Sequence, residues 1–325
     1  MCPTPYNKLL EQFERSLSLL SFPEDPQNMY SPITYALSAG GKRIRPTLLL
    51  LAYNIYRDDT EKAMGAAFAV EILHNFTLVH DDIMDKATLR RGLPSVVAKW
   101  NSNSALLSGD AMLVTAYTFL EKINPEMLPC ILSIFNQMAL KVCEGQQLDL
   151  DFEKREKVTV VEFLRMTELK TSFLLGGSVA MGATLAGAQE DDIEKLRSFA
   201  SDLGIAFQMQ DDLLDCFGDD SFGKKIGGDI LEGKMTFLKI NAISRANDEQ
   251  RNILRETHLR KDLTTDEKIN TIKDLYVKLG VVSLIENQIK IHISRAISYL
   301  DSLSVKKEKL DELKSYTRSL LGRHF

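Results

Sequence analysis

The sequence predicts an all-α fold, on the evidence of proline placement, residue usage and the absence of strand-like alternation. All nine prolines fall within the first 129 of the 325 residues. The remainder is rich in Leu, Ala, Glu and Lys and shows no period-2 alternation of apolar residues. Because proline breaks helix interiors and these residues favour helices, we predict a large bundle of about ten or more helices.

The chain is predicted to form a single domain over residues 1–325. It contains no linker rich in Gly, Ser or Pro and no repeat of fixed period. The apolar stretch from Ala63 to Val79 predicts a buried central helix. Turn residues place breaks at Pro23–Pro32, Ala39–Gly41, Arg57–Thr60, Gly92–Pro94, Asn124–Pro125, Glu153–Lys157, Gly187–Asp191, Gly218–Gly228 and Leu263–Asp266.

Composition excludes several classes of protein. A net charge of −5 without a basic face argues against a nucleic-acid partner. The four cysteines show neither zinc-ligand nor disulfide-framework spacing. The first twenty residues lack the apolar core of a signal peptide, and the run from Leu48 to Tyr56 is too short to span a bilayer. We therefore expect a cytoplasmic protein without stable membrane insertion.

Two DDxxD motifs are the main chemical signal. Asp81 and Asp85 lie four residues apart, so their carboxylates share one face of a helix. Such hard oxygen ligands suit Mg²⁺, which takes its other ligands from water and phosphate. An isolated motif is roughly as often a solvated acidic helix end. The arrangement recurs from Asp211 to Asp215, and both copies follow apolar residues, which favours a metal site.

Basic residues that could bind a diphosphate occur in compact groups. Lys42 and Arg45 lie three residues apart behind two glycines that allow close approach to a ligand. Arg90 and Arg91 follow Asp85 closely and could offer bidentate contacts to phosphate oxygens. The alternatives are a basic surface turn and a salt-bridge network. Further candidates, each alone more often a surface lysine, are Lys170, Lys224, Lys225 and Lys234.

His74 precedes Asp81 by almost two helical turns and shares its face. A lone His on an apolar helix is more often a hydrogen-bonded core residue than a ligand. Glu71 and His74 also match the ExxH motif of di-iron bundles, but that architecture needs a second ExxH, which the sequence lacks. A nucleophile elbow or a matched Cys/His pair is also missing from the sequence, so hydrolase chemistry is not supported.

In order and spacing, these motifs resemble those of the trans-isoprenyl diphosphate synthase, or polyprenyl synthetase, family, which includes farnesyl and geranylgeranyl diphosphate synthases. The resemblance covers about Ser31 to Leu238. The matching segments are GGKRIRP (Gly40 to Pro46), HNFTLVHDDIMDKATLRRG (His74 to Gly92), SGDAML (Ser108 to Leu113), EGQQLDL (Glu144 to Leu150), KTSFL (Lys170 to Leu174), FQMQDDLLDCFGD (Phe207 to Asp219) and GKKIGGDILEGK (Gly223 to Lys234).

The resemblance implies a bundle of the isoprenoid synthase type around a central deep cavity, commonly as a homodimer. It implies that three Mg²⁺ ions and the allylic diphosphate are bound by Asp81, Asp85 and Asp211. Asp82 and Asp215 have supporting roles, and Asp215 is also expected to be a metal ligand. It assigns isopentenyl diphosphate to Gly41, Lys42, Arg45, His74 and Arg91. It assigns the allylic diphosphate to Arg90, Lys170, Lys225 and Lys234, with Thr171 and Gln208 facing the allylic carbon.

The implied reaction fits these residues. Mg²⁺, Arg and Lys stabilise the departing diphosphate, and the Thr171 side chain and nearby carbonyls stabilise the allylic cation that remains. Lys170, which would bind the diphosphate, and Thr171 are therefore expected to be catalytic. The double bond of isopentenyl diphosphate then attacks the cation. In this family the released diphosphate is the favoured base, which explains why no dedicated acid or base is found.

Product length is predicted from the residues before Asp81. On an ideal helix, Leu73 and Thr77 lie nearest the line of the carboxylates, whereas Phe76 is rotated aside. The family pattern nevertheless points to Phe76, because a bulky aromatic five positions before the first Asp resembles enzymes that stop near C20. We therefore expect geranylgeranyl diphosphate, with C15 farnesyl diphosphate next.

Two alternatives differ in class. A terpene cyclase shares helices and an acidic motif, but it usually carries an NSE-type second motif and lacks GGKRIRP. A non-catalytic subunit of a heteromeric synthase tends to lose acidic residues, whereas both motifs are intact here.

Overall fold

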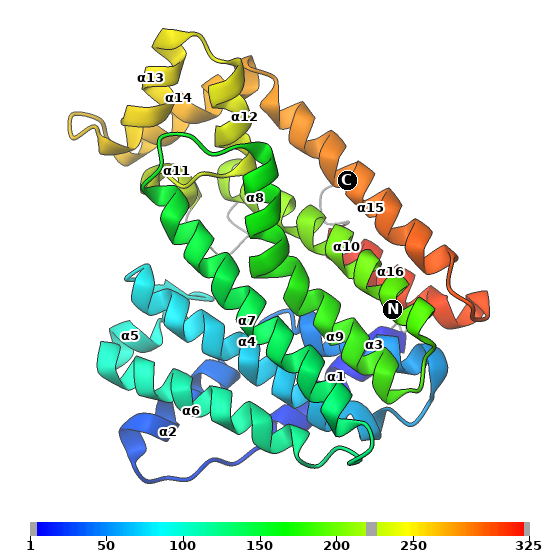
Figure 1. Ribbon diagram of the computed structural model, residues 1–325. Helices are drawn as coiled ribbons and strands as arrows, with labels where there is room; N and C mark the ends of the chain where they lie inside the picture. The colour runs from blue at the N-terminus through cyan, green and yellow to red at the C-terminus, as the bar shows by residue number, and fades with distance from the viewer. Residues whose placement is uncertain (1–4, 219–225, 322–325) are drawn as a thin grey trace. The chain divides into compact units, whose positions relative to one another are not determined.

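The computed structural model describes residues 5–218 and 226–321, and it is built almost entirely of helices (Figure 1). The only strands in these ranges are β1 (Leu89–Arg90) and β2 (Leu93–Pro94), which pair in an antiparallel hairpin. The predicted all-α fold is therefore confirmed. No helix in these ranges has both the length and the apolar character needed to cross a bilayer.

The chain divides into two compact units, which are described separately. Whether they form the predicted single domain stays a prediction. Within the described residues, unit 1 comprises 5–140, Leu174–Ser198 and Tyr299–Ser319, and unit 2 comprises Lys141–Phe173, 199–218, 226–298 and 320–321.

Unit 1 is organised around α4 (Met64–Met84), the predicted central helix. Its side chains from Ala66 to Leu73 are buried, and α4 packs closely along α6 (Figure 1). The other helices with most of their length in this unit are α1 (Pro5–Ser18), α2 (Gln27–Ser38), α3 (Ile44–Tyr56), α5 (Val96–Lys99), α6 (Ser102–Leu120), α9 (Phe173–Leu185) and α16 (Asp311–Leu321).

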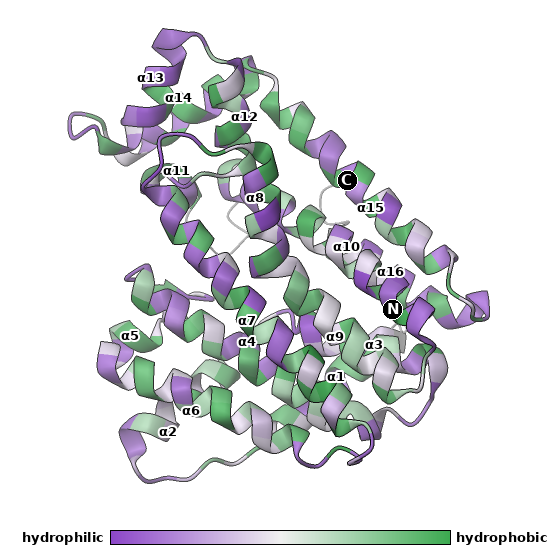
Figure 2. Cartoon of the chain, in the orientation of Figure 1, coloured by the Kyte–Doolittle hydropathy of each residue, from purple (hydrophilic) through white to green (hydrophobic). Residues whose placement is uncertain are grey.

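Unit 2 includes the second half of α10 (Glu190–Phe217), which ends in the second acidic motif. A helical run from α8 (Val160–Thr167) passes into α9 through a π-helix at Glu168–Ser172. In Figure 2, α13 (Asp248–Glu256) is largely hydrophilic, and Leu254 is its one buried residue. The remaining helices are α7 (Leu128–Glu153, shared with unit 1), α11 (Gly228–Glu232), α12 (Phe237–Arg245), α14 (Thr265–Lys278) and α15 (Val281–Asp301).

Most predicted breaks coincide with helix ends. The Ala39–Gly41 break lies between α2 and α3, and the Arg57–Thr60 break follows α3. Gly92–Pro94 instead belongs to the β1–β2 hairpin, because Arg91 and Gly92 both adopt positive φ angles, of 54° and 74°, which form a tight reversal.

We predict that Gly182→Ala destabilises unit 1. An added Cβ at Gly182, on α9, would overlap the backbone carbonyl of Leu49 on α3, which cannot move without shifting that helix. Overpacking of this kind should lower the free energy of unfolding by about 2 kcal/mol or more, measurable by urea denaturation. The control is Gly176→Ala on the same helix, where the nearest atom, Arg197 O, is 3.9 Å away. Equal stability of the two variants would contradict close α3–α9 packing.

Candidate active site

The first acidic motif closes α4 and divides its carboxylates between two environments. Asp82 is 2% exposed and accepts hydrogen bonds from Arg90 Nε at 2.9 Å and Nη2 at 2.5 Å. Burial raises the pKa of Asp82 against the opposing effect of Arg90. Asp81 is partly exposed and lies 3.4 Å from Arg90 Nη2, while Asp85 is exposed. Asp85 therefore faces outward and Asp81 is partly exposed with one carboxylate oxygen buried, whereas Asp82 ties Arg90 to the helix.

The Gly40–Gly41 turn contacts Arg91. Gly41 has a φ of 132°, and an added Cβ would lie 2.8 Å from the guanidinium carbon of Arg91. Arg91 in turn donates through Nη1 to the carbonyl of Gly40. A side chain at position 41 would displace this guanidinium, and the φ angle of Gly41 would strain any other residue there. The adjoining Lys42 is exposed at the start of the segment that leads into α3.

Arg45 and His74 meet across α3 and α4, with 3.0 Å between Arg45 Nη1 and His74 Nε2. An Arg guanidinium can only donate, so Nε2 accepts and the proton of the neutral ring lies on Nδ1. Nδ1 is buried and has no hydrogen-bond partner among the described residues. Burial of the ring, reinforced by Arg45 and Arg91, lowers the pKa of His74 well below 6.5. The ring is a neutral donor surrounded by cations.

Unit 1 thus brings together the predicted residues Gly41, Arg45, His74 and Arg91. The sequence reasoning missed the pair beneath them. Arg43, which precedes α3 with a φ of 45°, donates to Glu71 on α4 at 2.6 Å. Both side chains are at most 2% exposed. Arg43 also donates to Glu14 at 2.8 Å and to Leu37 O at 2.6 Å. The signal available in the sequence was the position of Glu71 within an apolar helix. A carboxylate buried there needs a cation as its partner.

The predicted chain-length residues all lie on α4. Leu73 is fully buried, and Phe76 is 9% exposed. Thr77 is partly exposed and donates through Oγ1 to His74 O at 2.7 Å. The Phe76 ring meets His80 edge-on, with centroids 4.6 Å apart. Phe76 therefore lies on the face of α4 that carries His80.

In unit 2 a chain of hydrogen bonds links the predicted allylic residues to the second acidic motif. Thr171 Oγ1 donates to Gln208 Oε1 at 3.2 Å, and Gln208 Nε2 donates to Asp212 Oδ1 at 3.0 Å. Phe237 N donates to the other Asp212 oxygen at 3.2 Å. Burial, with Asp229 nearby, raises the pKa of Asp212 to about 8. Asp212 is thus the buried counterpart of Asp82, and Asp211 and Asp215 are the partly exposed members.

Lys170 and Thr171 lie in the π-helix, at the closest approach of α7. An added Cβ at Gly145, on α7, would overlap the backbone nitrogen of Lys170. Four residues further along α7, Asp149 forms a 2.5 Å ion pair with Lys170 Nζ. Neither Gly145 nor Asp149 was predicted as a site residue, although both belong to the EGQQLDL segment. The π-helix places Lys170 next to α7 and Thr171 next to α10. Composition does not indicate this local geometry.

Asp215 organises the segment that follows α10. Asp229 N donates to Asp215 Oδ2 at 3.1 Å, and Gly227 N donates to its carbonyl at 2.7 Å. Lys234 forms a 2.9 Å ion pair with Glu232 and lies 3.9 Å from Asp229. The predicted site residue Lys225, like Lys224, lies outside the described residues.

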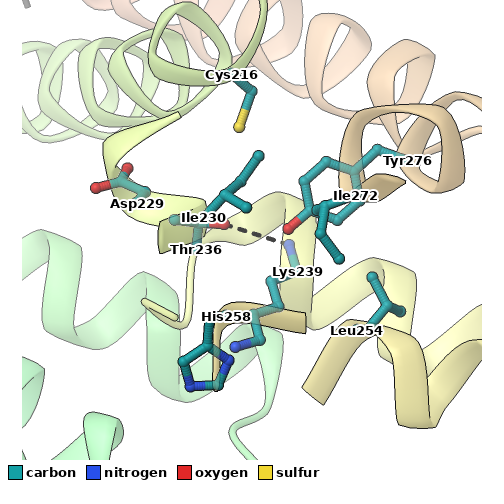
Figure 3. A pocket seen from close by; sticks show the side chains of 9 residues that line it. All are labelled: Cys216, Asp229, Ile230, Thr236, Lys239, Leu254, His258, Ile272 and Tyr276. Atoms are coloured by element: carbon teal, nitrogen blue, oxygen red, sulfur yellow. Dashed lines mark hydrogen bonds between the residues drawn. The ribbon is translucent and has the colours of Figure 1, made fainter. Parts of the chain in front are cut away.

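A small cavity lies behind this segment, with room for about one water molecule. Figure 3 shows the Lys239 and His258 side chains approaching each other there, with Cys216 and Tyr276 on the other side. Lys239 Nζ donates to Gly233 O at 2.8 Å, and burial lowers the pKa of Lys239 to about 8. The cavity is too small for a diphosphate and belongs to the packing that supports Asp229.

These features define a helical protein with two acidic helix ends, one beside a cluster of Arg and His and one beside Lys, Thr and Gln. The polyprenyl synthetase family model matches residues 26–276. Geranylgeranyl diphosphate synthase of Methanosarcina mazei is 37% identical over 293 residues, covering 89% of this chain and 85% of that protein. The chain belongs to the polyprenyl synthetase family.

Solved structures agree with this assignment. A crystal structure of geranylgeranyl pyrophosphate synthase, 39% identical, superposes with a TM-score of 0.93 and covers 99% of both chains. Geranylgeranyl pyrophosphate synthetase from Pyrococcus horikoshii is 30% identical, with a TM-score of 0.90 over 98% of this chain and 97% of that one. The isoprenoid synthase type of fold predicted from the motifs is confirmed.

We predict that His74 makes stability depend on pH. The pKa of His74 is lowered in the folded chain, so below about pH 6.5 the unfolded chain binds a proton that the native chain excludes. Stability should therefore fall with falling pH by up to about 1.4 kcal/mol per unit from this residue. Denaturant unfolding of the wild type and His74→Gln at pH 7 and pH 5.5 measures the difference. Parallel losses in the two proteins would show that His74 is not held neutral.

Proposed function

We propose that this protein is a prenyltransferase that condenses isopentenyl diphosphate with an allylic prenyl diphosphate, head to tail, to give a short-chain trans-prenyl diphosphate. The observation that carries the proposal is the cluster of Gly41, neutral His74 and the cations Arg45 and Arg91 beside the first acidic motif. Binding of metal by the carboxylates would not by itself require Arg45 and Arg91. A reaction that holds two diphosphates needs one site with metal and a second built from donors. The names of the relatives support this reading.

The acidic residues fit Mg²⁺ as the cofactor, with three ions expected. Asp81 and Asp85 offer carboxylate oxygens from one helix face, as do Asp211 and Asp215. Two carboxylates fill only part of an octahedral shell, which leaves positions for water and diphosphate oxygens. The bound ions would neutralise charge on the departing allylic diphosphate. Asp82 and Asp212, which are buried and hydrogen-bonded within the protein, support the outer residues.

The remaining residues divide between the two substrates. Isopentenyl diphosphate would be bound by Gly41, Lys42, Arg45, His74 and Arg91, with the exposed Lys42 reaching the diphosphate and His74 orienting Arg45. Arg90, Lys170, Lys225 and Lys234 would bind the allylic diphosphate. Arg90 is already aligned by Asp82, and Lys170 by Asp149.

Condensation then proceeds without a dedicated acid or base. The allylic C–O bond breaks and diphosphate leaves with the electron pair, while the Thr171 hydroxyl and Gln208 face the cation. The double bond of isopentenyl diphosphate attacks the cation and forms the new C–C bond. The resulting cation loses a proton to the released diphosphate, which restores a double bond. Homodimer formation and a cytoplasmic location remain predictions.

We predict that the purified chain extends a short allylic diphosphate when supplied with Mg²⁺ and labelled isopentenyl diphosphate. Chromatography of the phosphatase-treated products measures extension. Chelation of Mg²⁺ should abolish the activity, and Asp81→Asn should reduce it by about a hundredfold or more, the usual cost of losing charge stabilisation in a transition state. Asp248→Asn, at the exposed first residue of α13, is the charge-matched control.

No extension with any C5 to C15 primer would contradict the proposal. Cyclic hydrocarbon formed from a prenyl diphosphate alone would instead support a terpene cyclase. A chain that is active only with a second protein would support the subunit alternative.

We predict that the main product is C20 and that Phe76→Ala lengthens it by at least one C5 unit. Truncation removes a buried aromatic ring and leaves a cavity into which the hydrocarbon can grow. Product length, compared between wild type and variant with each primer, tests this. An unchanged product would assign the floor of the cavity to Leu73, Thr77 or another helix.

A further inference from the structure

His80 lies one helical turn after Phe76 and immediately before Asp81. The two rings meet edge-to-face, with centroids 4.6 Å apart and planes inclined by 62°. This arrangement is favourable because the positive edge of one ring meets the negative face of the other. Neither the motif reasoning nor the family resemblance gave His80 a role.

The His80 ring is itself fixed by α6. Its Nε2 lies 3.2 Å from the carbonyl oxygen of Leu106 and 3.8 Å from Asp110 Oδ1. The ring lies directly against Gly109, where an added Cβ would overlap both Nε2 and Cδ2. Any other residue at position 109 would have to displace the ring. Gly109 therefore creates the recess on α6 that receives His80.

These contacts form a connected series from α6 through His80 to Phe76. Phe76 is 9% exposed, and its aromatic contact is with His80. A side chain that limits the length of a hydrocarbon must resist displacement by it, since a ring that rotates away opens the cavity. The His80 ring lies against the Phe76 ring and is itself held against α6.

We propose that His80 is a specificity-determining positioning residue, which sets product length by holding the Phe76 ring in place and is held in turn by Gly109 and Leu106 of α6. The proposal rests on the proposed function, with Phe76 as the floor of the hydrocarbon cavity. His80 acts through Phe76 rather than on the substrate.

Replacement of His80 by Ala should broaden the product distribution toward longer chains. Loss of an edge-to-face pair should raise the ratio of longer products to the wild-type main product by roughly three- to tenfold. The ratio is measured by chromatography of dephosphorylated products at equal substrate turnover. Because His80 acts through Phe76, the double variant Phe76→Ala/His80→Ala should give the same distribution as Phe76→Ala alone.

Gly109→Ala tests the same series from the other helix. The added methyl group pushes the imidazole aside without substituting any residue of α4, so the distribution should shift in the same direction as with His80→Ala. Gly176→Ala is the matched control, since its methyl group has only ordinary contacts and the product should stay as in the wild type. Should His80→Ala not fold, His80→Gln, which can still donate to Leu106 O but lacks a ring, takes its place.

The outcomes separate this inference from the proposed function. An active His80 variant with the wild-type distribution overturns the inference, as does a double variant whose products are longer than those of Phe76→Ala. The second result would mean that His80 lines the cavity itself. A wild-type chain that extends no primer refutes the proposed function instead.

Discussion

The buried ion pair between Arg43 and Glu71 supports the whole cationic side of the site. Arg43 adopts a left-handed backbone conformation where the chain enters α3, a conformation that costs about 1 kcal/mol or more for a non-glycine residue. Its guanidinium donates hydrogen bonds to both the buried Glu71 carboxylate and the Leu37 carbonyl. Removing either partner would leave a buried charge, so the pair holds the start of α3 against α4. Arg45 lies two residues after Arg43, and His74 lies three residues after Glu71. The contact between Arg45 and His74 is therefore next to the ion pair.

In both acidic motifs, one carboxylate is buried and hydrogen-bonded within the protein while the others are more exposed. The second Asp of each motif is buried and satisfied by protein donors, Arg90 for Asp82, and Gln208 with a backbone amide for Asp212. The outer residues of each motif are more exposed. Burial holds a carboxylate in one orientation only if donors satisfy it, and that orientation fixes the helix face that the outer carboxylates share. In each DDxxD motif of this chain, the second Asp therefore supports the outer two.

Much of this could be predicted from the sequence, because the signals were local. Proline placement indicated the helices, and i, i+4 spacing put Asp81 and Asp85 on one face. The positive φ angles of Arg43 and Arg91 could not be predicted, since they depend on tertiary contacts that outweigh the preference of those residues. Glu71 matches an ExxH pattern in the sequence, but its partner in the structure is Arg43, which is distant along the chain. The π-helix at Lys170 could not be predicted either, because its close neighbours, Gly145 on α7 and Gly204 on α10, are distant along the chain.

Phe76 shows how spacing and packing combine. An ideal helix rotates Phe76 away from the line of the carboxylates, which argued for Leu73 and Thr77 as the limit to chain length. That rotation puts Phe76 on the same face as His80, which contacts α6. Leu73 is fully buried, whereas the Phe76 ring is held through His80, whose own ring lies against α6. Leu73 and Thr77 lie closer to the line, but Phe76 is the residue whose ring is held from a second helix.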